Sequence, residues 1–185
     1  MLTAELLIKE LSIIRGAKFI ENLSEKVIKE NFDINQLVDL TFHQNQQTGF
    51  RACWLLDSVM HLQSEKYAGN IGYIISRMPH VTNSSCERHF ARVLMLLTRS
   101  TASDTIREQI NAIDLEPVVE KCFDWLINPK VKVAVKATAA EVLFNLTPRY
   151  DWIKEELANQ MQFLMRDGTA AIQARGRKLL ALIQK

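Results

Sequence analysis

The sequence predicts an all-α fold, an α-solenoid in which antiparallel pairs of helices stack on one another. Three observations lead to this prediction. Apolar residues recur at helical spacing nearly throughout the 185 residues, and the long alternations of Val, Ile and Thr that would indicate strands are absent. The chain holds only six glycines and four prolines, which fall largely between the apolar segments. A stripe made of a small residue followed by leucines recurs four times.

The first six expected helices cover the N-terminal half, and glycine or polar residues explain several of their ends. Gly16 can end the first helix, because glycine readily takes the conformation that closes a helix. Asp33 can cap the third helix and Ser84 the sixth, since a side-chain oxygen can accept from the free N–H groups there. These helices are expected at about 3–15, 17–30, 34–43, 47–62, 64–78 and 85–99.

The other five helices are separated by similar signals. Ser103 can begin the seventh helix and Asp114 the eighth. Pro129 and Pro148 lie where a helix has to end, because proline cannot continue the hydrogen-bond ladder. These helices are expected at about 103–112, 116–127, 130–147, 150–166 and 169–184. Since no gap resembles an interdomain linker, residues 1–185 are expected to form a single domain.

The repeated stripe explains why the helices should stack. Its small residue is Ala52, Ala91, Ala140 or Gly176, so successive copies lie 39, 49 and 36 residues apart. A small residue lets two helices approach closely, while the leucines fill the space between them. A single helical pair cannot bury its apolar face, so pairs of about this length stack into a solenoid. An ordinary helical bundle whose leucines repeat by chance is the alternative.

At these residues the chain resembles the HEAT-like (armadillo-type) family of helical repeats, and the segment Val131–Leu146 is the most typical. The resemblance covers most of the chain. It implies a scaffold whose inner helices line a concave binding surface. Armadillo proteins hold peptides with a ladder of asparagines; Asn145 matches one such position, but Asp57, Leu96 and Ala181 occupy the others. Peptide binding through an asparagine ladder is therefore not expected.

A second resemblance involves the segments Cys122–Asn128 and Tyr150–Ile153. They are similar to small bacterial helical chains, some of which are labelled adenylosuccinate lyase. That lyase family is much longer and uses a Ser-Ser-x-Met-Pro-x-Lys-x-Asn loop. The similar run Asn83–Cys86 lacks the methionine, the proline and the lysine. We therefore expect no lyase activity.

Basic side chains gather on the second helix of several predicted pairs. Arg88, Arg92 and Arg99 are separated by four and seven residues, which places them on one helical face. If these helices line the concave side, they form a basic ridge, and the arginine fork suits carboxylates and phosphates. The sequence thus favours a non-catalytic module that binds an acidic protein or peptide there. A solvated face with local ion pairs is the alternative. The predicted partner-binding residues are Arg51, Arg88, Arg92, Arg99, Lys132, Lys136, Asn145, Arg175 and Lys178.

The second functional hypothesis is a nucleic-acid-binding or DNA-repair enzyme. Alkylated-DNA glycosylases use a HEAT-like scaffold and bring aromatic and acidic side chains to its concave face. Trp54 near Asp57 invites this comparison, although the apolar run around Trp54 predicts a core position. The pairs Asp124-Trp125 and Asp151-Trp152 point about 100° apart on a helix and form no joint site. A net charge of +2, from 23 basic and 21 acidic residues, also argues against a dedicated nucleic-acid binder.

Other kinds of site are not indicated. No Gly-rich phosphate loop or nucleophile elbow is present, so no catalytic residue and no cofactor are predicted. Cys86-x-x-His89 has the spacing of metal ligands, but a structural zinc site needs four, so no metal is predicted. No apolar run approaches the roughly 20 residues of a membrane-spanning helix. The odd number of cysteines suits buried thiols and a cytoplasmic location. A monomer and a homo-oligomer both fit the sequence.

Overall fold

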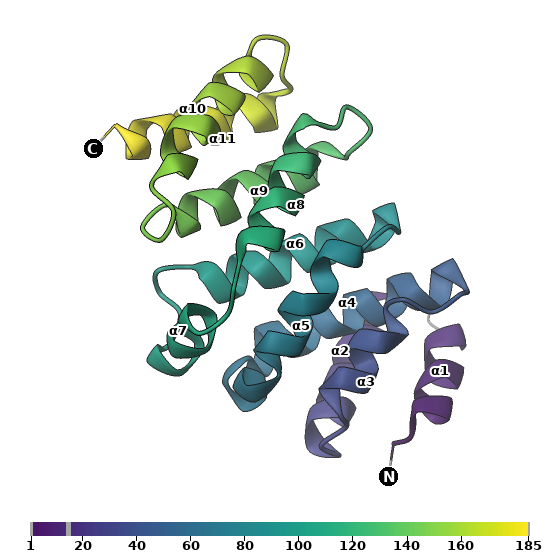
Figure 1. The fold of residues 1–185 in the computed structure, drawn as a ribbon. Coiled ribbons are helices and arrows are strands. Elements are labelled where there is room, and N and C mark those ends of the chain that lie inside the picture. Colours follow the sequence, from purple (N-terminus) through teal and green to yellow (C-terminus); the bar gives the residue numbers. More distant parts are fainter. Residues whose placement is uncertain (1, 14–15, 185) are drawn as a thin grey trace.

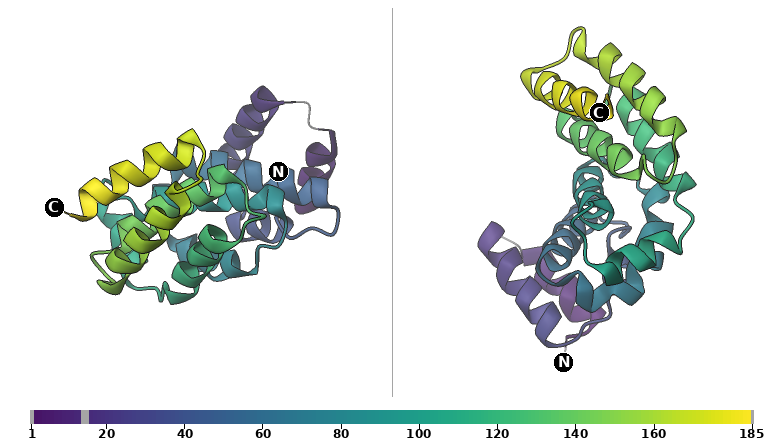
Figure 2. Two further views of the ribbon diagram at one scale, coloured as in Figure 1. Left: turned by 90° about the horizontal axis from the view of Figure 1, so that it is seen from above. Right: turned by 90° about the vertical axis from the view of Figure 1, so that its left-hand side faces the viewer.

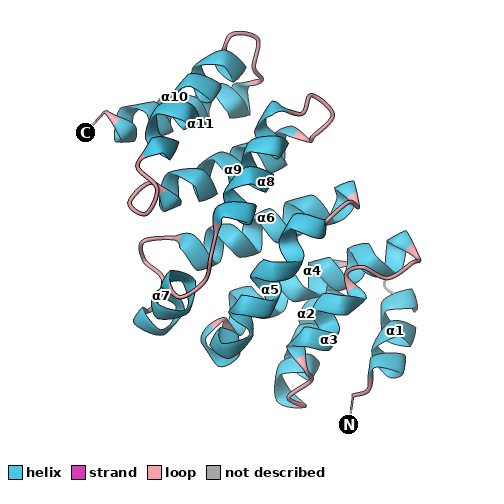
Figure 3. Cartoon of the chain, in the orientation of Figure 1, coloured by secondary structure: helices cyan, strands magenta, loops and turns pink. Residues whose placement is uncertain are grey.

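The computed structural model describes residues 2–13 and 16–184, and this part of the chain is helical, with no strand (Figures 1 and 3). It contains eleven α-helices and two 3-10 helices within those residues. The α-helices are α1 (Ala4–Ile13), α2 (Ala17–Lys29), α3 (Ile34–Leu40), α4 (Gln46–Gln63), α5 (Ile71–Arg77), α6 (Ser84–Thr98), α7 (Asp104–Asn111), α8 (Glu116–Ile127), α9 (Val133–Leu146), α10 (Trp152–Met165) and α11 (Ala170–Ile183). The 3-10 helices are η1 (Glu65–Asn70) and η2 (Met78–His80).

The predicted helices correspond to these α-helices in order, and the clearest difference lies at 64–78. There the chain forms η1, then α5, then η2 rather than one continuous helix. Tyr67 departs from α-helical geometry inside η1, with φ −106° and ψ 20°. Pro79 has no N–H to donate, so α5 ends before it and the chain tightens into η2.

Local hydrogen bonds fix several helix starts. The side chain of Asp33 accepts a hydrogen bond from the N–H of Asn35 at 2.9 Å, as predicted for a cap. The cap of α6 is Asn83 rather than Ser84, and it accepts from the N–H of Ser85 at 3.0 Å. Gly16, expected to end the first helix, directly precedes α2 with a φ of 147°, a value that favours glycine. Residues 14–15, predicted to end the first helix, lie outside the described residues.

The helices are arranged in two rows (Figure 1). Helices α2, α4, α6, α9 and α11 contact one another in succession and form what we call the inner row. Helices α3, α7, α8 and α10 each contact helices of the inner row from its other side, and α5 lies between α3 and α7. Figure 2 shows that the stack is curved, with the inner row on its concave side and the two termini at opposite ends. The architecture is therefore the predicted α-solenoid of stacked helical pairs.

The core runs along the whole stack between the two rows. The small residues of the repeated stripe all lie in it, since Ala52, Ala91 and Ala140 are 0% exposed and Gly176 is buried. The leucines three residues after them, Leu55, Leu94, Leu143 and Leu179, are buried as well, whereas Leu182 at the end of the last copy is exposed. At Gly176 the small residue permits a close approach between α11 and α10, because a Cβ atom there would lie against Met165 and Met161 of α10. Side chains on the opposite face of the inner row remain free to form a surface.

Candidate functional site

A cavity of about 520 Å³ lies on the concave side, between α4, α6 and the start of α9. Arg88, Arg92 and Lys132 contribute basic groups to it. Phe50, Trp54 and His89 contribute rings. None of the described residues that line it is acidic. We call this space the basic cavity.

Residue spacing on two helices builds the wall of the basic cavity. Phe50 and Trp54 on α4 are four residues apart, as are Arg88 and Arg92 on α6, so each pair lies on one helical face. The ring of His89 on α6 packs against the Phe50–Trp54 pair, with its centroid 5.6 Å from that of Phe50 and 6.3 Å from that of Trp54. The three rings therefore form a continuous aromatic wall.

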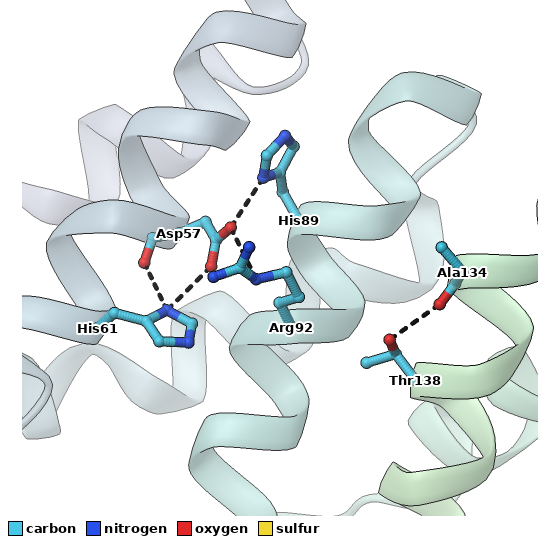
Figure 4. Close-up of polar contacts among 6 residues, drawn as sticks. All are labelled: Asp57, His61, His89, Arg92, Ala134 and Thr138. Atoms are coloured by element: carbon cyan, nitrogen blue, oxygen red, sulfur yellow. Dashed lines mark hydrogen bonds and ion pairs between the residues drawn. The ribbon is translucent and has the colours of Figure 1, made fainter. Parts of the chain in front are cut away.

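The buried carboxylate of Asp57 contacts three side chains, those of His61, His89 and Arg92 (Figure 4). Its Oδ2 atom lies 2.8 Å from Nδ1 of His89 and 3.3 Å from Nε of Arg92. Its Oδ1 atom lies 2.9 Å from Nδ1 of His61, which also lies 2.8 Å from the main-chain oxygen of Asp57. The side chain of Asp57 is only 3% exposed, whereas that of Arg92 is 41% exposed. Asp57 is thus buried, while Arg92, which it contacts, remains partly exposed.

This network shifts two pKa values. Burial by itself would raise the pKa of Asp57, but hydrogen bonds with His61 and His89 and the charge of Arg92 lower it overall. The hydrogen bond with Asp57 raises the pKa of His61, against the opposing effect of burial. Asp57 therefore stays ionised at neutral pH, and His61 holds its proton to higher pH than a free histidine does.

A second cavity, of about 430 Å³, adjoins the first on the side of α2. Trp54 and Arg92 line both cavities and so form their common wall. Glu21 and Glu25 of α2 line the second cavity, together with His61. We call it the mixed cavity, and the two cavities together the inner groove.

Three of the predicted partner-binding residues meet in the inner groove: Arg88, Arg92 and Lys132. Two others hold helices together. Arg51 donates from Nη1 to the main-chain oxygens of Leu11 and Ser12, at 2.8 and 3.0 Å, and so ties α4 to the end of α1. Lys136 is buried, and its Nζ donates to the main-chain oxygen of Leu126 at 2.8 Å. Burial lowers the pKa of Lys136.

The remaining predicted residues lie farther along the inner row. Arg175 and Lys178 of α11 both pair with Glu141 of α9, the second at 3.7 Å. Arg99 and Asn145 line a separate cavity of about 280 Å³ at the far ends of α6 and α9. The predicted basic ridge is therefore not continuous. Three of its residues lie in the inner groove, Arg51 and Lys136 donate hydrogen bonds to main-chain oxygens of neighbouring helices, and the other four residues lie in two clusters outside the groove.

Asp57, His61 and His89 of the network are absent from the predicted set, and so are Phe50, Glu21 and Glu25 of the groove lining. The four-residue spacing of Asp57 and His61 was a usable signal, but the partnership with His89 depends on how α4 packs against α6. Trp54, expected in the core, lies at its edge and lines both cavities instead, because its helix face turns toward the concave side.

The two Asp-Trp pairs and the Cys86-x-x-His89 spacing, which were not expected to form sites, do not form one with these neighbours. Trp125 is buried, whereas Trp152 is 54% exposed and stacks on Phe123. Cys86 is buried, and His89 faces Asp57. Among the described residues no three His, Cys, Asp or Glu side chains are grouped to hold a metal ion.

The curved stack and its concave groove define the class of the protein: a helical-repeat protein with an inner binding surface. The model of the HEAT repeat domain matches residues 7–183, nearly the whole chain, and the chain belongs to the HEAT repeat family. HEAT repeat domains typically serve as scaffolds for protein interactions. Searches of the curated proteins and of the solved structures gave no match. None of the helices in the described part of the chain has the length and apolar character needed to cross a bilayer.

Proposed function

We propose that the protein is a non-catalytic interaction module whose inner groove binds an acidic segment of a partner protein. One observation carries this proposal: Arg88, Arg92 and Lys132 meet in the basic cavity, and no described residue lining that cavity is acidic. Opposite charge steers an acidic partner toward such a surface and disfavours basic ones.

The arrangement of the basic cavity suits this role. Arg88 and Lys132 are exposed, so both can pair with carboxylates without losing a contact within the protein. Arg92 is held by Asp57 through Nε. A guanidinium fixed in this way loses less conformational entropy on binding than a free one. The aromatic wall adds apolar area next to the charges, and aromatic side chains are common in the centres of interfaces.

The other predicted residues take different parts in the proposal. Arg99, Asn145, Arg175 and Lys178 are predicted outlying contacts for a partner that extends along the inner row. Arg51 and Lys136 are left out of the binding surface, because their N–H groups are bonded to main-chain oxygens of neighbouring helices.

Fluorescence anisotropy with a labelled peptide tests this proposal. The probe is an eight-residue peptide of Asp and Glu with a central Phe. We expect the double variant Arg88→Ala/Lys132→Ala to bind it about fivefold more weakly than the wild type, since two partly screened charge pairs are lost. The control is Lys9→Ala/Lys154→Ala, which removes the same charge from exposed positions on α1 and α10. Equal losses in the two variants, or none in either, would overturn the proposal.

Nucleic-acid binding is the second candidate function, and the nearness of Trp54 to the basic side chains favours it. Aromatic and cationic groups together bind single strands by stacking and by phosphate contacts. The acid that a glycosylase-like enzyme would direct at the DNA corresponds best to Asp57, which is 3% exposed and covered by its three partners. A labelled 12-nucleotide single strand and its duplex, measured at low salt beside the acidic peptide, compare the candidates. Tighter binding of either DNA than of the peptide would favour this second function.

We also propose a cytoplasmic location and a single functional domain over residues 1–185. The three cysteines are free and buried, which suits a reducing compartment. The inner row continues without a break in its succession of contacts from α2 to α11. Limited proteolysis tests the second point: a single resistant fragment of nearly full length is expected, and two stable fragments would contradict it.

A further inference from the structure

The inner groove carries opposite charges at its two ends. From this we infer the charge pattern of the partner: an extended segment with acidic residues at one end, an apolar centre and basic residues at the other. The acidic end lies in the basic cavity, and the basic end lies over Glu21 and Glu25. This inference rests on the proposed function, because it describes the segment that the groove binds.

The two halves form one continuous path. Trp54 of α4 and Arg92 of α6 line both cavities, so the two cavities adjoin at these side chains. The path crosses α2, α4, α6 and the start of α9, which are successive neighbours in the inner row. A ligand that fills one half therefore meets the other half directly beside it.

The charges of the mixed cavity differ from those of the basic cavity. Its ionisable groups are Glu21, Glu25, Asp57, His61 and Arg92. The last three are engaged with one another in the buried network. Glu21 and Glu25 are both exposed and lie one turn apart on α2. The ionisable groups of this half that lie outside the network are therefore two carboxylates, opposite in charge to Arg88 and Lys132.

Helix spacing sets the length of the segment. Packed helices lie about 8–10 Å apart, so three steps from α2 to α9 span roughly 24–30 Å. An extended chain covers about 3.3 Å per residue. Seven to nine residues, as an order of magnitude, therefore join the two ends of the groove. The central residues of that segment lie over Phe50 and Trp54, where apolar side chains bury the most surface.

A uniformly acidic segment fits less well over this length. It pairs with Arg88 and Lys132, but its other end meets Glu21 and Glu25 and is repelled. A segment with basic residues at that end replaces two repulsions with two attractions. The groove therefore selects the order of charges along the segment, in addition to acidity itself.

Three labelled eight-residue peptides test this inference by anisotropy at about 50 mM salt, where charge pairs are weakly screened. One has Asp and Glu at one end, Phe in the centre and Lys at the other end; the second is acidic at both ends and the third is basic at both ends. We expect the wild type to bind the bipolar peptide about fivefold more tightly than the acidic one. Equal affinity for these two peptides would overturn the inference.

The variant Glu21→Lys/Glu25→Lys should reverse that order, with weaker binding of the bipolar peptide and tighter binding of the acidic one. The matched control is Glu155→Lys/Glu156→Lys, which changes the net charge equally at exposed positions of α10. If circular dichroism shows that Glu21→Lys/Glu25→Lys is unfolded, the milder variant Glu21→Gln/Glu25→Gln takes its place. In the milder variant the preference for the bipolar peptide should disappear.

The outcomes separate the inference from the function on which it rests. If Arg88→Ala/Lys132→Ala weakens binding while the Glu21 and Glu25 variants leave the preference unchanged, the bipolar inference is wrong and the acidic-segment proposal stands. If neither pair of residues affects any peptide, both are wrong. If the basic peptide binds best, the groove is dominated by its acidic half and both are again wrong.

Discussion

At the scale of single residues, the buried carboxylate of Asp57 connects side chains from two helices of the inner row. A buried carboxylate without partners would be strongly destabilising, and this one is stable because its partners are His61, His89 and Arg92. The partners come from two helices of the inner row, so the network also joins α4 to α6. The same contacts that stabilise the packing orient the side chains of the groove.

Asp57→Asn is expected to lower the free energy of unfolding by about 2 kcal/mol, because hydrogen bonds to a charged group are replaced by weaker neutral ones. The pH profile should change as well. The pKa of His61 is raised in the folded protein, so its contribution is complete below about pH 6.5 and is lost as the pH rises through the folded pKa. The pKa of Asp57 is lowered, so its contribution is lost as the pH falls below about 3.8 and through the folded pKa.

Urea unfolding of both proteins between pH 3 and pH 9 measures these effects. In the wild type, stability should decline above about pH 6.5, and in Asp57→Asn this decline should be flatter. Asp124→Asn, at an exposed position of α8, is the control and should behave as the wild type does. An unchanged decline in Asp57→Asn would show that His61 does not depend on Asp57.

At the scale of elements, the packing of α4 on α3 depends on a glycine at the start of α4. A Cβ atom at Gly49 would lie 2.9 Å from the main-chain oxygen of Thr41 and 3.5 Å from that of His43. Main-chain oxygens cannot rotate away as a side chain can. The glycine therefore sets how closely the N-terminal turn of α4 approaches the end of α3.

We predict that Gly49→Ala lowers the free energy of unfolding by about 2 kcal/mol, since the two elements have to move apart. Gly72→Ala in α5 is the control: the nearest atom to its Cβ would be Cδ1 of Ile113, at 3.9 Å. That variant should be neutral or more stable by up to about 1 kcal/mol, because alanine is the better helix former. Equal effects at the two positions, measured by urea unfolding, would refute the close-approach argument.

At the scale of the whole molecule, stability follows the order of the stack. Each helix of the inner row contacts its neighbours in that row, as expected for a solenoid. Helix α4 also contacts α1, α3 and η1, whereas α10 and α11 pack mainly on each other and on α9. The pair α10–α11 therefore has support on one side only.

Hydrogen exchange should reveal this difference. Amides of α10 and α11 are expected to exchange at least about tenfold faster than those of α4 and α6, because an end pair can open without disturbing the rest of the stack. Mass spectrometry of peptic fragments measures the rates. Uniform protection along the chain would indicate that the stack opens only as a whole.

Much of the fold could be predicted from local patterns. Helical spacing and proline positions define most helices, and the small residues at Ala52, Ala91 and Ala140 predict the inner contacts. The interruption at 64–78 could not be predicted in this way, because Tyr67 departs from helical geometry within a segment that is apolar at helical spacing. Only part of the site was predictable: Arg88 and Arg92 share a face by spacing, but their meeting with Lys132 depends on α6 packing against α9.

The sequence by itself determined that this chain forms helices, that the helices stack and that basic residues accumulate on the inner row. Helical geometry fixes which side chains within one helix share a face, and the stripe that predicts stacking repeats 36 to 49 residues apart. Tertiary structure decided which basic side chains can face a partner. Arg51 and Lys136 donate hydrogen bonds to main-chain oxygens, whereas Arg88, Arg92 and Lys132 line one cavity. It also decided the role of Asp57, because a partner such as His89 is chosen by distance in space rather than along the chain.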